Sequence, residues 1–237
     1  MAEGEAESGR PRVRSVHGRR KGPKLSPRKQ ALLERVLPRL RISRPGPRPG
    51  GLDLAALFGR GYRRYGLEIG FGKGEHLAAR AATEPETGFI GCEPYLNGLV
   101  AFLDRAEEQG LENVRVYDDD ARHILEALAE NALDVVYLIH PDPWPKRRHA
   151  KRRFVNPGNL DLLARILRPG GALLIVTDDP VHRQWTAIQM AQRREFEWTA
   201  ECPADWRQAP AGWIETRYAE KAERAGRSDT FFLYRRM

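Results

Sequence analysis

The sequence predicts an α/β protein with a mostly parallel, seven-stranded, doubly wound sheet and a basic N-terminal extension. Three observations lead to this fold class. Short apolar runs alternate with segments of helical periodicity from about Tyr62 to the end of the chain, which is typical of parallel sheets covered by helices on both faces. A glycine-rich turn follows the first apolar run, and acidic residues follow the next ones.

Length and composition support one sizeable domain with an extension. The chain has 237 residues, of which 41% are hydrophobic. We expect a flexible basic arm over residues 1–24, a short helix and a Pro/Gly linker over 25–50, and the main domain over 51–237. Two cysteines, Cys92 and Cys202, form no disulfide framework and favour a reducing cytoplasm. No apolar run reaches the length of a membrane span.

The net charge of +8 is unevenly distributed. Residues 10–48 hold 14 Lys and Arg against one acid, Glu34, and residues 146–153 hold six more basic side chains. Two positive patches on an otherwise slightly acidic body suit a phosphate backbone, so the sequence indicates a nucleic-acid partner. For residues 1–24 a disordered solubilising tail is the alternative.

The predicted elements follow in chain order. Ser26 and Pro27 predict the cap and first residue of a short helix, and Asn156 and Pro157 do the same for a later one that ends before Pro169. The other expected helices cover about 76–82, 121–129 and 181–193. The first expected strand ends at Gly70. The other expected strands cover 88–92, 114–117, 133–140, 172–177, 196–200 and 230–234.

The first turn carries Glu68 in the strand end, followed by Gly70, Gly72 and Gly74. Glycines tolerate positive φ and let a ligand approach the backbone, and the helix behind them offers unpaired N–H groups. A dinucleotide fingerprint would need glycine at Glu75, which disfavours a nicotinamide dehydrogenase. The spacing resembles the first motif of class I S-adenosylmethionine methyltransferases, where Glu68 would accept a hydrogen bond from the ligand's ammonium group.

Acids also end the second and third strands. Glu93 stands where nucleoside-binding folds of this kind bind a ribose diol, and Asp118, Asp119 and Asp120 are suitably placed for an adenine edge. Each acid alone could be a solvated loop carboxylate or a helix cap. Three acids at consecutive strand ends favour a nucleoside site.

The end of the fourth strand is the candidate active site. It reads His140-Pro-Asp-Pro-Trp-Pro and runs into the basic residues from Lys146. Two prolines fix the backbone around Asp142 at the carboxyl edge of the sheet, where ligands bind in such folds. A structural turn is the alternative for Pro-Asp-Pro. Trp144 would stack on a base or wedge against the strand.

Together these residues resemble the bacterial tRNA (guanine-N7)-methyltransferase family from about His17 to the end. The motifs that carry the resemblance are Leu-Glu-Ile-Gly-Phe-Gly, Pro-Asp-Pro-Trp, Lys146 with Lys151-Arg152-Arg153, Thr177-Asp178 and Thr216-Arg217-Tyr218. The resemblance implies a Rossmann-like, cytoplasmic methyltransferase with tRNA as its partner. Its target would be the variable-loop guanosine (nucleotide 46).

The resemblance also implies roles for individual residues. S-adenosylmethionine would be bound by Glu68, Gly70, Gly72, Gly74, Glu93, Asp120 and Asp142, of which Asp142 would also be catalytic. The substrate would contact Lys146, Asp178, Thr216, Arg217, Tyr218 and Ala219. We expect phosphate contacts from Arg147, Arg148, Lys151, Arg152 and Arg153.

The chain departs from the family pattern at two positions. The family commonly has an aromatic residue where this chain has His140, and the glutamate after Tyr218 is replaced by Ala219 or shifted to Glu220.

Two other functions are open at this level. An exocyclic-amine methyltransferase would have two adjacent prolines, whereas Asp142 separates them here. A non-catalytic RNA-binding protein would not need the acids at the strand ends. No His or Cys cluster has metal-ligand spacing, so we expect no metal. Monomer and homodimer are both compatible with the sequence.

Overall fold

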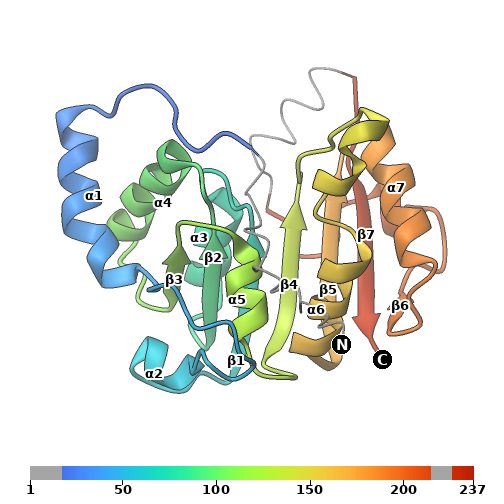
Figure 1. Cartoon of the computed structure of the whole chain (residues 1–237), viewed down its shortest axis with the longest axis horizontal. Coiled ribbons are helices and arrows are strands. Elements are labelled where there is room, and N and C mark those ends of the chain that lie inside the picture. Colours follow the sequence, from blue (N-terminus) through green and yellow to red (C-terminus); the bar gives the residue numbers. More distant parts are fainter. Residues whose placement is uncertain (1–17, 215–225) are drawn as a thin grey trace, which may run out of the picture.

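The computed structural model describes residues 18–214 and 226–237. Within them, seven strands form one sheet in the order β3-β2-β1-β4-β5-β7-β6 (Figure 1). β1 to β5 run parallel, and β7 is antiparallel to both of its neighbours. The strands are β1 Arg64–Ile69, β2 Thr87–Cys92, β3 Val114–Tyr117, β4 Leu133–Ile139, β5 Leu167–Thr177, β6 Phe196–Trp198 and β7 Thr230–Arg236. The predicted α/β fold with a mostly parallel sheet is confirmed.

Helices cover both faces of the sheet. The helices are α1 Pro27–Leu40, α2 Leu54–Phe58, α3 Glu75–Thr83, α4 Leu96–Glu108, α5 Ala121–Ala127, α6 Pro157–Ile166, α7 Pro180–Met190 and α8 Ala204–Arg207, with the 3-10 helix η1 at Arg147–Arg152. One core joins the sheet to α5, α6 and α7, and the other joins it to α1, α3 and α4. Strand residues alternate between the two cores, as in a doubly wound sheet.

Side-chain caps start the helices where the sequence predicts them. Ser26 accepts a hydrogen bond from the backbone N–H of Lys29, and Asn156 accepts one from Asn159 at 3.1 Å. In both helices a proline follows the cap. Proline has no backbone N–H, and this costs no hydrogen bond at the first helical position because an N–H there has no acceptor within the helix.

The described part of the N-terminal extension packs on the domain. The side chains of Leu32 and Val36 in α1 are buried in the core that α4 shares. The backbone N–H of Ile42 donates to the Val116 carbonyl at 2.7 Å, so the chain covers the β3 edge of the sheet. Residues 1–17 lie outside the described residues.

Residues 18–24 lie against the loops at the carboxyl edge. Leu96 donates its backbone N–H to the Arg20 carbonyl at 3.0 Å, and the Asn97 side chain bonds both Gly22 and Pro23. Arg20 also pairs with Asp119 at 2.6 Å. In Figure 1 this segment (blue) runs from α1 past the start of α4 toward the middle of the sheet.

All five parallel strands therefore end at one edge, and the loops that follow them carry the predicted site residues. No helix in the described ranges is long and apolar enough to cross a membrane.

Candidate functional site

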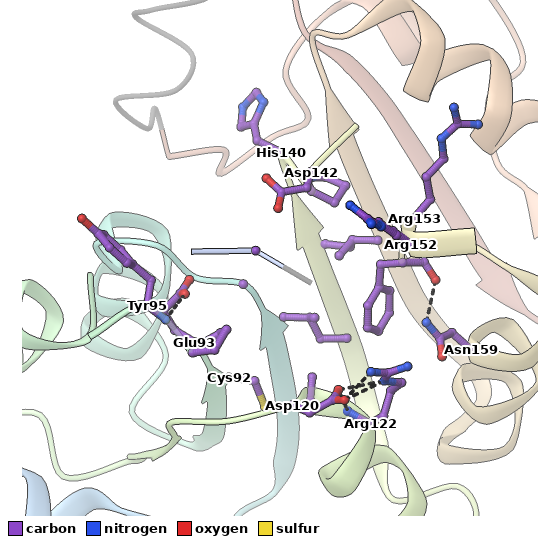
Figure 2. A pocket seen from close by; sticks show the side chains of 18 of the residues that line it. Cys92, Glu93, Tyr95, Asp120, Arg122, His140, Asp142, Arg152, Arg153 and Asn159 are labelled. Atoms are coloured by element: carbon purple, nitrogen blue, oxygen red, sulfur yellow. Dashed lines mark hydrogen bonds and ion pairs between the residues drawn. The ribbon is translucent and has the colours of Figure 1, made fainter. Parts of the chain in front are cut away.

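A cavity of about 490 Å³ opens at the carboxyl edge of the sheet (Figure 2). Its walls come from the loops after β1, β2, β3 and β4, from the start of the described chain, and from the segment around η1. Of the predicted site residues it gathers Gly70, Gly72, Glu93, Asp120, Asp142, Lys151, Arg152 and Arg153. The volume is within the range of about 300–1,000 Å³ that small-molecule sites occupy.

The glycine turn supplies an open stretch of backbone. Gly70 and Gly72 have φ of 73° and 58°, in the left-handed region that favours glycine. A Cβ at Gly70 would meet nothing within 4 Å, so the space beside this backbone is free for a ligand. Gly74 has another role: it precedes α3 with φ of 70°, and a Cβ there would overlap the Phe102 ring.

Glu93 connects β2 to the glycine turn. One carboxylate oxygen accepts the backbone N–H of Gly72 at 2.7 Å and the other accepts that of Tyr95 at 2.8 Å. Burial raises the pKa of Glu93 to about 7, although the two backbone hydrogen bonds act in the opposite direction. Each oxygen keeps a lone pair, so the carboxylate can still accept two ribose hydroxyls.

Glu68 does not line the cavity. Alternation along β1 points Ile69 to the cavity side, and the buried Glu68 carboxylate contacts Nδ1 of His76 in α3 at 2.7 Å. The predicted contact between Glu68 and an ammonium group stays a prediction.

The three acids after β3 have different partners. Asp118 pairs with Arg41 at 2.9 Å, and Asp119 pairs with Arg20. Asp120 caps α5 and accepts hydrogen bonds from Arg122 at 2.8–3.0 Å. Burial opposes ionisation of Asp120, but the Arg122 contacts outweigh it and hold its pKa below the ordinary value. Of the predicted adenine-binding acids, Asp119 and Asp120 reach the cavity wall.

The segment after β4 has a constrained backbone. His140 and Trp144 both have positive φ, 47° and 42°. Asp142 lies between them with its side chain accessible at the cavity, and desolvation by the surrounding chain raises its pKa. The guanidinium of Arg152 lies 5.0 Å from the centre of the Trp144 ring.

Arg153 differs from the other predicted phosphate contacts. Its side chain is buried, and its guanidinium donates to the carbonyls of Pro143 and Trp144 at 3.0 Å each while stacking over Trp185. Its hydrogen bonds to these two carbonyls therefore hold the backbone of the Pro-Asp-Pro-Trp segment in place. By contrast, Lys146, Arg147, Arg148 and Lys151 are exposed.

The remaining substrate-binding candidates are not all described. Asp178 lies beyond β5, where it pairs with Arg227 at 2.9 Å, and it does not line the cavity. Thr216, Arg217, Tyr218 and Ala219 lie outside the described residues.

Sequence reasoning missed several lining residues, among them Arg19, Tyr95 and Arg122. For Arg122 a signal exists, because it stands two residues after an acid that caps a helix. No group of three His, Cys, Asp or Glu in the described part of the chain could hold a metal ion.

Comparisons with known proteins extend this result. A family model described as "Putative methyltransferase" matches residues 63–231. The solved 16S rRNA methyltransferase KamB gives a TM-score of 0.52 at 16% identity, over 74% of this chain and 88% of that one. A "putative methyltransferase" from Streptococcus mutans in complex with SAH gives a TM-score of 0.50 at 11% identity, over 74% and 90%. At these identities the two structures support the fold alone.

Curated relatives are much more similar. The tRNA (guanine-N(7)-)-methyltransferase of Rhizobium meliloti (strain 1021) is 48% identical over 219 residues, which are 92% of this chain and 94% of the relative. The protein of that name from Zymomonas mobilis is 44% identical over 225 residues, 95% of each. The fold, the family model and these relatives together define a class I S-adenosylmethionine-dependent methyltransferase. Within that class, the chain belongs to the tRNA (guanine-N7)-methyltransferase family.

Proposed function

We propose that this protein transfers a methyl group from S-adenosylmethionine to N7 of the variable-loop guanosine of tRNA. One observation carries the proposal: Asp142 lines the same cavity as the glycine turn and Glu93, and the basic helix η1 follows directly in the chain. A nucleoside cofactor and an RNA base can therefore meet at Asp142.

The cavity residues suit a nucleoside cofactor. When bound, S-adenosylmethionine supplies an electrophilic methyl group on its sulfonium. Glu93 would accept the ribose hydroxyls, and Gly70 and Gly72 would let the ligand approach their backbone. Asp120 would accept from the adenine edge, and Glu68 would contact the ammonium group if it exchanged its His76 partner.

Guanine N7 needs little chemical assistance. It carries an in-plane lone pair and no proton, so no general base is required and positioning becomes the main contribution. Methylation makes the imidazole ring of the base cationic. The Asp142 carboxylate would orient the base and stabilise that developing charge.

The basic surface suits the phosphates of tRNA. Lys146, Arg147, Arg148 and Lys151 are exposed around η1, and Arg152 reaches the cavity wall. We assign phosphate contacts to these five side chains. By family resemblance, Lys146, Asp178 and residues 216–219 would contact the target nucleoside.

Residues 1–24 would act as a basic arm, residues 25–50 would connect it to the catalytic domain over 51–237, and the enzyme would work in the cytoplasm. Sedimentation of the purified protein distinguishes a monomer from a homodimer.

Incubation with labelled S-adenosylmethionine and unmodified tRNA tests the function, with digestion of the product to nucleosides. We expect the label in 7-methylguanosine, and its loss from a tRNA in which adenosine replaces the variable-loop guanosine. Label on an adenine or cytosine amine would identify an exocyclic-amine enzyme instead. Binding of both ligands without transfer would identify a non-catalytic RNA-binding protein.

A further inference from the structure

His140 has an unusual backbone at the junction between β4 and the Pro-Asp-Pro-Trp segment. Its φ of 47° is in the left-handed region, which is uncommon for residues other than glycine. Pro141 follows it, and proline restricts the residue before it to extended conformations. Its backbone N–H donates to the Val176 carbonyl in β5 at 2.9 Å. A residue with a strained backbone of this kind persists only where surrounding contacts hold it in that conformation.

The side-chain contacts of His140 help to hold its backbone in this conformation. The imidazole is only 5% exposed and lies between two carboxylates. Its Nδ1 is 3.6 Å from Asp178, which follows β5, and its Nε2 is 3.4 Å from Asp229, which precedes β7. The His140 ring therefore contacts an aspartate next to β5 and an aspartate next to β7, while the backbone of His140 directly follows β4.

The two carboxylates differ in their other partners. Asp178 also pairs with Arg227 at 2.9 Å. Asp229 is 9% exposed, and its Oδ1 has no hydrogen-bond partner among the described residues. A buried carboxylate is costly without a compensating polar partner, and each ring nitrogen of His140 faces one of the two carboxylates. His140 thus gives Asp229 a polar partner at 3.4 Å, which a phenyl ring at this position could not do.

We infer that His140 is a positioning residue for methyl transfer: its contacts with Asp178 and Asp229 fix the turn that carries Asp142 to the cavity. The inference rests on the proposed function and adds a part to it. Figure 2 shows the His140 and Asp142 side chains extending from the end of β4 in different directions. His140 acts through the backbone, and Asp142 would contact the reactants.

The test compares His140→Phe, which keeps a ring and removes both nitrogens, with His140→Gln, which keeps a donor. His123→Phe, half-buried on α5 at the β3 side of the sheet, is the matched control. For each variant we would measure kcat, the KM for tRNA, the Kd for S-adenosylhomocysteine and the crystal structure.

We expect His140→Phe to lower kcat by about tenfold to a hundredfold, since a displacement of about 1 Å can have that effect. The Kd for S-adenosylhomocysteine should stay within about twofold of the wild-type value, and the crystal structure should show Pro141–Trp144 displaced. His140→Gln should recover most of the kcat. His123→Phe should match the wild type.

Three results would overturn the inference: wild-type kcat in His140→Phe, an undisplaced Pro141–Trp144 segment, or equal losses in the Phe and Gln variants, which would indicate packing alone. The wild-type product tests the proposed function separately. If wild-type protein methylates another atom, the proposed function fails, while the displacement of the segment still decides the role of His140.

Discussion

The carboxylate of Glu93 accepts the backbone N–H of Gly72 at 2.7 Å, which joins the tip of β2 to the turn after β1. Two parts of the chain that would face the same nucleoside therefore hold each other in place before any ligand arrives. The contact also keeps the Glu93 carboxylate buried, so cofactor affinity and stability should both depend on pH.

Cofactor affinity should rise with pH around the pKa of Glu93, about 7. Only the ionised carboxylate can accept from two ribose hydroxyls while it holds Gly72 and Tyr95. Below the pKa we expect affinity to fall by up to about tenfold per pH unit. Calorimetric titration with S-adenosylhomocysteine at several pH values measures this, and in Glu93→Gln the pH dependence should disappear.

The same carboxyl group should weaken the fold at high pH. Its pKa is higher in the folded chain than the ordinary 4.5, so the folded state binds more protons between about pH 4.5 and 7. Its contribution to stability is therefore present below that window and is lost as the pH rises through it. Glutamine has one oxygen and can accept only one of the two N–H groups, so the test is the pH dependence: as the pH rises from about 4.5 to 7, the denaturant midpoint of wild type should fall relative to that of Glu93→Gln, and a relative rise would contradict this.

Replacing Asp142 should remove transfer and leave binding. Asp142→Ala and Asp142→Asn should both lower kcat by at least about a hundredfold, because the cationic product ring would lose its stabilising charge. Filter binding of tRNA should change by less than about twofold. Asp161→Asn, at an exposed acid on α6, is the control. Retained turnover in Asp142→Asn would exclude a charge-based role.

Neutralising the basic residues of η1 should weaken tRNA binding in a salt-dependent way. Lys151→Gln and Arg148→Gln each remove one exposed cation, and each should reduce the slope of log Kd against log salt by about one. Arg194→Gln, at an exposed arginine between α7 and β6, should leave the slope unchanged. Unchanged slopes in the η1 variants would move the RNA surface elsewhere.

Gly98 in α4 should be needed for the shape of the glycine turn. A Cβ at Gly98 would overlap the Gly72 carbonyl oxygen, so Gly98→Ala must displace a wall of the cavity that it does not itself line. We expect at least about a tenfold loss of cofactor affinity and about 1–3 kcal/mol lower stability. Gly158→Ala in α6, where a Cβ would meet only ordinary contacts, should retain affinity and gain stability by up to about 1 kcal/mol.

The sequence predicts the cavity better than the side chains around it. The positions of Gly70, Glu93, Asp120 and Asp142 follow from local signals, since strand ends and glycine turns depend on neighbours in the chain. The pairing of Glu68 with His76 depends on which face of β1 receives α3. The inward direction of Arg153 depends on carbonyls nine and ten residues away, and no periodic pattern marks it.

The N-terminal extension shows the same limit. Its composition indicates a mobile basic arm, yet residues 18–24 bond to Asn97 and Asp119 through long-range side-chain contacts. Such contacts leave no periodicity in the sequence. They bring Gly18 and Arg19 to the cavity, which composition alone does not predict.

The central claim is that S-adenosylmethionine binds along the carboxyl edge of β1, β2, β3 and β4. A crystal structure of the protein with S-adenosylhomocysteine measures this directly. We predict the ribose hydroxyls on Glu93, the adenine near Asp120 and the sulfur within reach of the Pro-Asp-Pro-Trp segment. A ligand bound elsewhere, or a segment that turns Asp142 away from the sulfur, would contradict the account.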